Sequence, residues 1–378
     1  MSEWKKVKFL DVISLNPRIS LEKGVEYPFV EMSNAVPGAR RPEKDVYQKY
    51  SGGGAKFEEG DTVVARIEPC LQNGKGFQCS YKKGFGSTEF LVFRPMNIKE
   101  MDYNFLYYYM GQQSIREAMA KTMVGASGRQ RVNNAAFNDL QIHLPPLSIQ
   151  HDIATILSRY DSLIENYQKQ IKLLEEAAQR LYKEWFVDLH FPGHENTKIV
   201  DGVPEGWNPS KLGQLAEFKR GKTITKKDVV DGPIPVVAGG LEPAYYCNKS
   251  NTAERVITVS GSGANAGFTR MYFEKVWASD CSYIDLETTQ FLHFVYCYLK
   301  DNKTTIDNMQ KGAAQPHVYA KDINALGLCI PTEDVLNTFE KKVSRYFNTI
   351  SSLQSQIRLL TEARDRLLTK LMSGEIAV

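Results

Sequence analysis

A long heptad pattern constrains this chain more than any other feature. From Ile153 to Trp185, apolar residues recur at alternating spacings of four and three, which is typical of a helix that supercoils around a partner. Pro145 and Pro146 precede the pattern and cannot lie inside a helix. At ~1.5 Å per residue, roughly forty helical residues make a rod of about 60 Å. Such a rod requires a partner helix.

The partner lies in the same chain. Adding 186 to each residue number of the first pattern gives a second pattern, from Phe339 to Leu371, in the same register. Between residues 158–181 and 344–367, 13 of the 24 aligned residues are identical. We therefore expect two copies of one helix, packed against each other in antiparallel orientation. The predicted helix-pair interface consists of Ile153, Leu157, Tyr160, Ile164, Tyr167, Ile171, Leu174, Leu181, Phe339, Val343, Tyr346, Ile350, Leu353, Ile357, Leu360, Leu367 and Leu371.

The segments that precede the two helices also repeat. Each contains an apolar run typical of a strand, a segment that ends in a second strand, and then an aromatic helix. The matched segments are Thr62–Arg66 with Val256–Ser260, Gly86–Phe93 with Ala278–Asp285, and Phe105–Met110 with Phe294–Leu299. Each half is thus predicted to be a mixed α/β domain of the α+β type, here called a head, followed by one rod. A tandem duplication explains this order, and the resulting fold would have pseudo-twofold symmetry.

The duplication predicts five segments. They are a first head at residues 1–145, a first helix at 146–189, a linker at 190–206, a second head at 207–331 and a second helix at 332–378. The linker is rich in proline, glycine and polar residues, which favours an irregular connection.

Composition excludes several classes of protein. With 42% hydrophobic and 24% charged residues, the chain is typical of globular proteins rather than of disordered ones. The net charge is only +3, so a nucleic-acid-binding surface would have to be local. Six scattered cysteines without a C-x-x-C pair favour free thiols in a reducing cytoplasm. The sequence contains neither a signal peptide nor an apolar run long enough to span a membrane.

Motifs that carry chemistry are not evident. Gly261–Gly267 follows a predicted strand, but the residues after it are typical of a strand, which favours a turn over a phosphate-binding loop. His190 and His194 are four apart, yet Pro192 lies between them, so no helix can present both to a metal. The amino-methyltransferase signature, a Walker motif and a nuclease carboxylate cluster are all missing from the sequence. We therefore predict no catalytic and no metal-binding residues.

The heads do contain basic and amide side chains in their loops. Arginine, glutamine and asparagine are suited to base edges, whereas lysine is suited to phosphates. The candidate DNA-binding residues are Arg40, Arg41, Arg66, Lys75, Arg129, Gln130 and Arg131 in the first head, and Lys219, Arg220, Lys222, Lys226, Lys227 and Arg270 in the second.

The order of motifs resembles the specificity subunit of type I restriction-modification systems. The resemblance rests on Leu144–Gln150 (LPPLSIQ), the heptad rod, Trp185–Pro192 (WFVDLHFP) and Val203–Trp207 (VPEGW), and it extends over both halves. It implies that the heads are target recognition domains, each of which reads one half of a bipartite sequence in double-stranded DNA. It also implies that the helices set the spacing and dock two methyltransferase (modification) subunits, which motor/nuclease subunits join in the full complex.

This resemblance implies a DNA-binding subunit without catalytic activity of its own. S-adenosylmethionine would be bound by the partner methyltransferase subunit, so no cofactor is expected on this chain. Two alternatives remain open. A self-sufficient DNA methyltransferase or nuclease would bind S-adenosylmethionine alone, and a coiled-coil scaffold would have no DNA affinity. RNA binding is a third alternative, to be tested by competition with duplex DNA.

The chain departs from the family pattern and from its own symmetry. Ile149 replaces the usual glutamate of the family motif, so we expect a different cap at the start of the first helix. Arg364 stands where the first helix has Ala178, which makes the helix pair asymmetric. Ile149, Ile156 and Leu163 widen the apolar stripe of the first helix. We predict that this extra surface binds the bases of the heads or a methyltransferase subunit.

Overall fold

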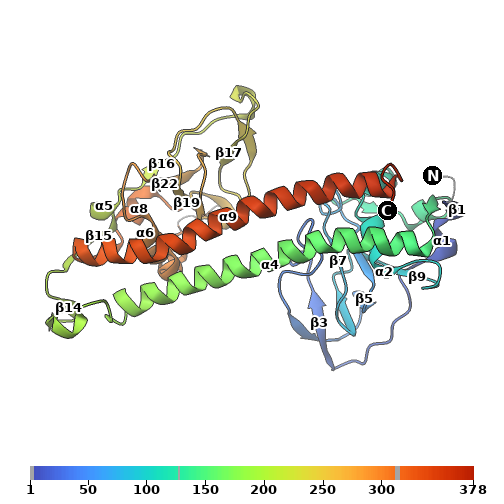
Figure 1. The fold of residues 1–378 in the computed structure, drawn as a ribbon, viewed down its shortest axis with the longest axis horizontal. Coiled ribbons are helices and arrows are strands. Elements are labelled where there is room, and N and C mark those ends of the chain that lie inside the picture. The colour runs from blue at the N-terminus through green and yellow to red at the C-terminus, as the bar shows by residue number, and fades with distance from the viewer. Residues whose placement is uncertain (1–3, 127, 311–315) are drawn as a thin grey trace. The chain divides into compact units, whose positions relative to one another are not determined.

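Two long helices dominate the mixed α/β fold (Figure 1). The computed structural model describes residues 4–126, 128–310 and 316–378. Helix α4 (Leu147–Phe186) and helix α9 (Glu333–Met372) have 40 residues each and pack side by side, as predicted. The chain divides into two compact units, residues 1–166 with 356–378 and residues 167–355. Each unit contains one head, one end of α4 and one end of α9.

The first head is built on two four-stranded sheets. The strand orders are β2-β9-β6-β7, entirely antiparallel, and β4-β3-β8-β5, in which β3 and β8 are parallel. Strand β1 pairs with β12, the strand that leads into α4. The elements are β1 (Lys5–Lys8), α1 (Phe9–Val12), β2 (Ile13–Leu15), β3 (Glu26–Val30), β4 (Tyr47–Lys49), β5 (Ala55–Glu58), β6 (Thr62–Ala65), β7 (Gly76–Gln78), β8 (Lys83–Gly86), β9 (Phe90–Pro95), α2 (Tyr103–Met110), α3 (Gln113–Ala120), β10 (Met123–Val124), β11 (Arg131–Val132), η1 (Asn134–Phe137) and β12 (Gln141–Leu144).

The second head has one four-stranded sheet of the same order as β2-β9-β6-β7, and its other sheet has three strands instead of four. Its sheets have the orders β16-β22-β19-β20 and β18-β17-β21, and β15 pairs with β23, which leads into α9. The elements are β15 (Asn208–Lys211), α5 (Leu212–Leu215), β16 (Lys219–Arg220), η3 (Lys226–Asp228), β17 (Ile234–Val237), β18 (Tyr245–Cys247), β19 (Val256–Ser260), η4 (Gly263–Asn265), β20 (Thr269–Tyr272), β21 (Trp277–Ala278), β22 (Cys281–Asp285), α6 (Leu292–Asp301), α7 (Lys303–Asn308), α8 (Ala320–Asn324) and β23 (Gly327–Ile330). The connection from α4 contains η2 (His194–Asn196) and a two-stranded hairpin of β13 (Ile199–Val200) and β14 (Val203–Pro204).

Strand pairing corrects two predicted alignments between the heads. Ala65 and Ser260, the last residues of β6 and β19, correspond, so the match of Thr62–Arg66 with Val256–Ser260 is off by one residue. Gly86 pairs with the end of β3 as Ala278 pairs with the end of β17, so these two residues correspond. Phe90 pairs with the last residue of β6 as Cys281 pairs with the last residue of β19. Residues 87–89 therefore correspond to residues 279–280 in the alignment of the two heads. The match of Gly86–Phe93 with Ala278–Asp285 is wrong beyond its second residue. The first head has one additional residue in this turn. With that residue taken into account, Glu89 is the equivalent of Asp280.

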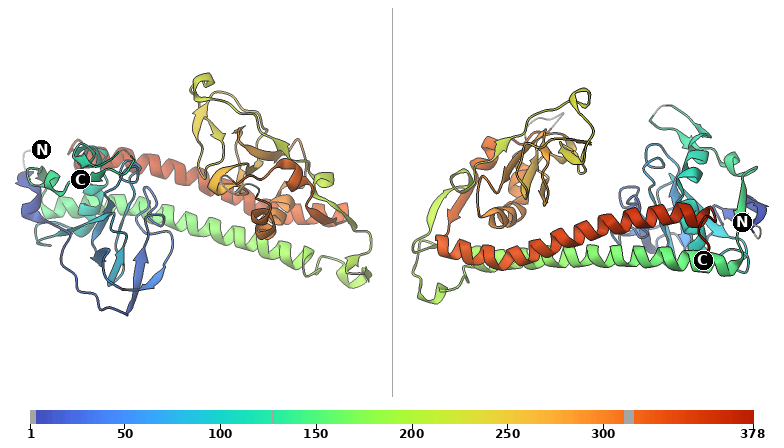
Figure 2. Two further views of the ribbon diagram at one scale, coloured as in Figure 1. Left: turned by 180° about the vertical axis from the view of Figure 1, so that it is seen from behind. Right: turned by 45° about the horizontal axis from the view of Figure 1, so that its top comes forward.

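The helix pair contributes to the core of each unit. In the first unit, Ile153 and Leu157 of α4 and Leu371 of α9 join the core of the first head. In the second unit, Trp185 of α4 and Phe339 of α9 join the core of the second head. Since the start of α4 meets the end of α9 in one unit and the reverse holds in the other, the helices run antiparallel in both (Figure 2). Every residue of the predicted helix-pair interface is buried or partly buried.

No helix in the described part of the chain is both long and apolar enough to cross a lipid bilayer. All six cysteines are free thiols.

Candidate nucleic-acid interface

A buried ion pair joins the two helices in the first unit. Arg364 of α9 donates from Nη1 to Asp161 Oδ1 of α4 at 2.7 Å and to the carbonyl of Gly38 at 2.9 Å. The hydroxyl of Tyr108 in α2 donates to the other oxygen of Asp161. Burial opposes the charge of Arg364, but Asp161 and Asp365 raise the pKa of the guanidinium above its usual value. This polar cluster links the first head to both helices.

Gln150, in the first turn of α4, forms a second link to the first head. Its side chain is fully buried. The amide nitrogen donates to the carbonyls of Glu100 at 2.7 Å and Pro145 at 2.9 Å. The amide oxygen accepts from the N–H of Asp102 at 2.9 Å. Because Asp102 also caps α2, Gln150 fixes the aromatic helix of the head relative to α4.

The second head is joined to the helices by aromatic rings. Phe339 of α9 contacts Trp185 and Phe186 of α4, at centroid distances of 5.8 and 5.0 Å. Phe294 of α6 packs on Phe186 at 4.8 Å. Glu340 of α9 adds a polar contact, since it accepts from the N–H of Phe294 at 2.8 Å. His293 of α6 also lies 2.6 Å from Glu340 through Nδ1 and Oε2, so aromatic packing and a buried polar contact together attach this head.

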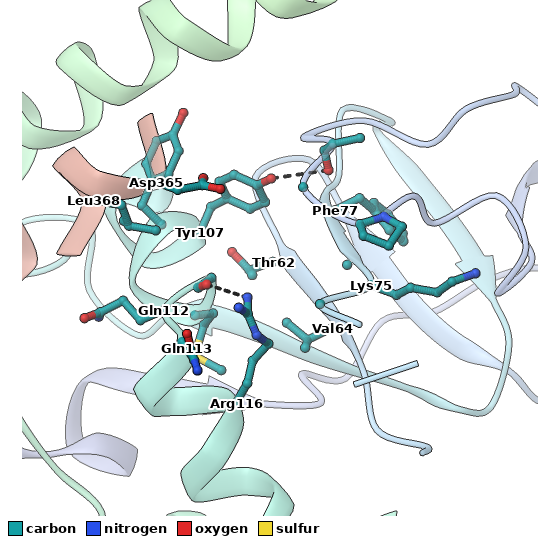
Figure 3. A pocket seen from close by; sticks show the side chains of 18 of the residues that line it. Thr62, Val64, Lys75, Phe77, Tyr107, Gln112, Gln113, Arg116, Asp365 and Leu368 are labelled. Atoms are coloured by element: carbon teal, nitrogen blue, oxygen red, sulfur yellow. Dashed lines mark hydrogen bonds between the residues drawn. The ribbon is translucent and has the colours of Figure 1, made fainter. Parts of the chain in front are cut away.

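The first unit also contains a cavity of about 420 Å³ beside the Arg364 cluster (Figure 3). Thr62 of β6, Tyr107 of α2, Arg116 of α3 and Leu368 of α9 are among the residues that line it. Thr62 is 1% exposed, and its hydroxyl has no hydrogen-bond partner among the described residues. Tyr107 donates to the carbonyl of Ala39 at 3.3 Å. The charged groups here are already engaged within the protein, so the cavity does not identify a ligand.

Several basic side chains predicted to bind DNA in the first head also contact the protein itself. Arg40 donates from Nη2 to Gln78 Oε1 at 2.6 Å, and its guanidinium lies 5.8 Å from the ring centroid of Tyr107. Arg41 donates to the carbonyl of Gln78 at 3.1 Å, and Lys75 donates to a loop carbonyl at 2.9 Å. These contacts hold the loop that follows β3 against the head.

The remaining candidates of the first head gather near the loop between β10 and β11. Arg66 donates from Nη2 to the carbonyl of Val132 at 2.9 Å. Arg131 is held by Glu89 through three hydrogen bonds. Gln130 donates to a carbonyl of its own loop at 3.4 Å, and Arg129 is exposed.

The second head exposes most of its predicted candidates. Five basic residues lie on β16, on η3 and in the segment between them, and all are exposed: Lys219, Arg220, Lys222, Lys226 and Lys227. Within the described residues, none of these five forms an ion pair. Arg270 differs, because it donates to the carbonyl of Leu241 at 2.8 Å and lies 4.9 Å from the ring centroid of Tyr272. A local basic surface thus lies at the start of the second head.

The segments excluded as ligand sites adopt ordinary local structure. Gly263–Asn265 forms the short helix η4, and strand β20 follows it, as the turn interpretation predicts. The rings of His190 and His194 are 5.4 Å apart, and His194 Nδ1 lies 2.8 Å from the carbonyl of Phe191. Within the described residues, no group of three metal-ligating side chains is close enough to hold an ion.

Sequence reasoning missed the residues that attach the heads. Gln150 stands inside the LPPLSIQ motif, and its position in a named motif was the available signal. Asp161 and Tyr108 gave no signal, because each is a single polar residue in a helical pattern. Only the folded chain shows that Asp161 accepts hydrogen bonds from both Arg364 and Tyr108.

Comparison with known proteins identifies the family. The model of the type I restriction modification DNA specificity domain matches residues 1–176 and 204–360. The chain belongs to this family. It is 28% identical to the type I restriction enzyme MjaIX specificity subunit of Methanocaldococcus jannaschii, over 72% of this chain and 69% of that protein. It is 22% identical to the HindI specificity subunit of Haemophilus influenzae, with both chains covered in full.

A solved structure has the same fold. The crystal structure of the type I restriction-modification S subunit from M. genitalium matches with a TM-score of 0.58 and 19% identity, over 97% of this chain and 96% of that chain. The predictions of the family and of the fold are thereby confirmed. A specificity subunit is the non-catalytic component of a type I restriction-modification enzyme, and this chain has two DNA specificity regions.

Proposed function

We propose that this specificity subunit recognises a bipartite sequence in double-stranded DNA, with one half read by each head. The supporting observation is the pair of heads that share the strand order of one four-stranded sheet but differ in their exposed side chains. The first head packs on the first turns of α4, and the second packs on its last turns. Because the loops of the two heads differ, we expect the two half-sites to differ as well.

The helix pair would set the gap between the half-sites. Inserting seven residues at Tyr167 of α4 and at the equivalent Leu353 of α9 keeps the heptad register. Each helix would lengthen by ~10 Å, which corresponds to about three base pairs. The expected result is a methylated sequence with unchanged halves and a longer gap, read by sequencing the modified bases in genomic DNA. An unchanged gap would contradict the proposal. Insertion of two residues is the control, since it rotates the following part of the apolar seam by about 200° and should prevent assembly.

The helices would also dock two methyltransferase subunits, one on each copy of a repeated exposed surface. Leu173 and Leu359 occupy equivalent positions and are 60% and 59% exposed. The exposed residues Glu176 and Arg180 recur as Glu362 and Arg366. An exposed leucine contributes little to the fold, so its presence in both copies favours a contact made twice with the same partner.

Stoichiometry tests this docking surface. Leu173→Asp or Leu359→Asp should each reduce the complex from two methyltransferase subunits to one, and the double variant should bind none, as measured by mass photometry. Leu286→Asp, at an exposed leucine of the second head, is the matched control and should retain two. Full assembly by the double variant would contradict the proposal that Leu173 and Leu359 dock the methyltransferase subunits.

The extra apolar stripe of α4 was predicted to bind a head or a methyltransferase subunit. Two of its residues, Ile149 and Ile156, pack against the first head.

The other partners follow from membership of the family. Motor/nuclease subunits would complete the restriction complex in the cytoplasm, and S-adenosylmethionine would be bound by the methyltransferase subunits. A gel shift with the assembled complex should select one duplex over random duplex, with affinity that falls steeply as salt rises. Equal affinity for all duplexes would contradict sequence recognition.

A further inference from the structure

The two heads share one backbone arrangement where their central strands end. In the first head, an isolated β-bridge joins Ile67, which follows β6, to Arg131. The flanking hydrogen bonds run from the N–H of Glu68 to the carbonyl of Gln130 at 3.0 Å and from the N–H of Val132 to the carbonyl of Arg66 at 2.9 Å. The backbone of Arg131, the first residue of β11, is therefore fixed beside the end of β6, an inner strand of the sheet.

The second head repeats each of these contacts. An isolated bridge joins Ser262, which follows β19, to His317. The flanking hydrogen bonds run from the N–H of Gly263 to the carbonyl of Pro316 at 3.0 Å and from the N–H of Val318 to the carbonyl of Gly261 at 3.1 Å. His317 thus occupies the position of Arg131. Because Glu89 corresponds to Asp280, each head has a carboxylate next to this position.

The contacts of Arg131 leave part of its guanidinium available. Glu89 accepts from Nε at 2.8 and 2.9 Å and from Nη2 at 2.7 Å. Arginine has five N–H donors, so both donors of Nη1 and one of Nη2 remain. The side chain is 48% exposed, and Glu89 is 21% exposed. Two adjacent donors with a fixed direction match the O6 and N7 acceptors of guanine.

We propose that Arg131, oriented by Glu89, reads a guanine in the half-site of the first head, and that His317 beside Asp280 occupies the corresponding reading position of the second head. This inference rests on the proposed DNA recognition and assigns its residues. Glu89 is a positioning residue, because it acts through Arg131. Prior orientation lowers the entropy lost when the guanidinium binds a base.

The corresponding pair of the second head has different chemistry. Asp280 accepts a hydrogen bond from the hydroxyl of Ser262 rather than from a base-reading arginine. The ring of His317 stacks on Tyr319, with centroids 5.8 Å apart and planes at 10°. Histidine has no bidentate fork, so the second half-site should differ from the first at the corresponding base pair.

The test uses the complex of the specificity subunit with its methyltransferase subunits. Genomic DNA from cells that express each variant is sequenced for modified bases, and the purified complex is titrated with duplexes that carry each base at the guanine in question. Arg131→Ala should lower discrimination at one base pair about tenfold or more and leave the other half unchanged. Arg131→Lys should have a similar effect, because an ammonium group keeps the charge but cannot bind O6 and N7 as a planar fork.

Two further variants separate reading from support. Arg129→Ala removes an exposed arginine of the same loop and should weaken binding to all duplexes about equally. Glu89→Ala should reduce discrimination less than Arg131→Ala does, and Glu89→Gln, which keeps one acceptor, should restore part of it. Unchanged discrimination in the folded Arg131→Lys complex would overturn the inference and leave DNA recognition intact. Failure of the wild-type complex to methylate any bipartite sequence would overturn the proposed function itself.

Discussion

The two heads are attached to the same pair of helices by different chemistry. In the first unit, Tyr108, Asp161 and Arg364 form a buried polar cluster. In the second unit, Phe186, Phe294 and Phe339 place aromatic rings at the contact between head and helices. These residues lie at different repeat positions, because Phe186 and Phe339 correspond to Met372 and Ile153 of the first unit.

The difference is specific to a few positions. Arg364 corresponds to Ala178, and Asp161 corresponds to Phe347, so each charged residue has an apolar counterpart in the other copy. Ala178 and Phe347 belong to one buried cluster. Likewise, Gln150 corresponds to the buried Leu336, and Glu340 corresponds to the buried Ala154. A duplicated backbone thus tolerates exchange between a charged pair and an apolar pair, provided that both members change together.

The largest effect is expected from breaking the charged pair of the first unit. Arg364→Ala leaves Asp161, which is 4% exposed, without its partner and should lower the free energy of unfolding by roughly 3–5 kcal/mol. Adding Asp161→Phe and Tyr108→Phe recreates an apolar contact like that of the second unit and should recover most of the loss. Urea denaturation followed by circular dichroism measures both. A triple variant less stable than Arg364→Ala would show that the exchange is not tolerated.

A smaller effect is expected where polar side chains bind the starts of the aromatic helices. Gln150→Ala removes the partner of one N–H and two carbonyls and should cost about 2–3 kcal/mol, because buried groups remain unpaired. Glu340→Gln is the matched variant in the second unit. It keeps an acceptor for the N–H of Phe294 and should cost less. The order of the two urea midpoints checks this, and a reversed order would contradict it.

The smallest effect concerns the reactivity of buried thiols. Burial raises the pKa of Cys79 in the first head and of Cys281 in the second to about 12. At pH 8 about one thiol in 10,000 is then ionised, so alkylation should require local opening of a head. Cys70 and Cys329, which are partly exposed, should react first, as read by mass spectrometry.

Unit-specific labelling sharpens the comparison further. Arg364→Ala should accelerate labelling of Cys79 and leave Cys281 unchanged, if the two units open independently. Equal acceleration of both would show that the units open together.

The same pKa values predict how stability depends on pH. Both thiols keep their protons up to about pH 12 in the folded state but lose them near pH 9 when unfolded, so their contribution to stability is present below pH 9. It is lost as the pH rises from 9 to 12.

Features that depend on local periodicity could be predicted from the sequence. The heptad pattern predicts the two helices, and the repeat predicts that both heads share one order of elements. Asp102 followed by an aromatic segment is also a recognisable helix start, and its side chain caps α2. In each case neighbouring residues determine the outcome.

The remaining features depend on contacts between distant residues. Arg40 is indistinguishable from a surface arginine in the sequence, yet its guanidinium lies over the ring of Tyr107. The correspondence of Glu89 with Asp280 was hidden by one extra residue in a turn, which only strand pairing reveals. Fixing Arg131 requires strand β11, about 65 residues downstream, to pair with the end of β6. Such pairings follow from the fold as a whole.

The Asp161–Arg364 pair has a consequence for shorter chains. A fragment with only the first head and α4 could pair with a second copy of itself through the same heptads, but the antiparallel register would then bury Asp161 beside Ala178 with no cation. Self-pairing of the second fragment would place Arg364 beside Phe347 instead. The charges of Asp161 and Arg364 are therefore paired only when α4 packs against α9. This pairing favours mixed dimers over like ones whenever the gene is split between its two repeats.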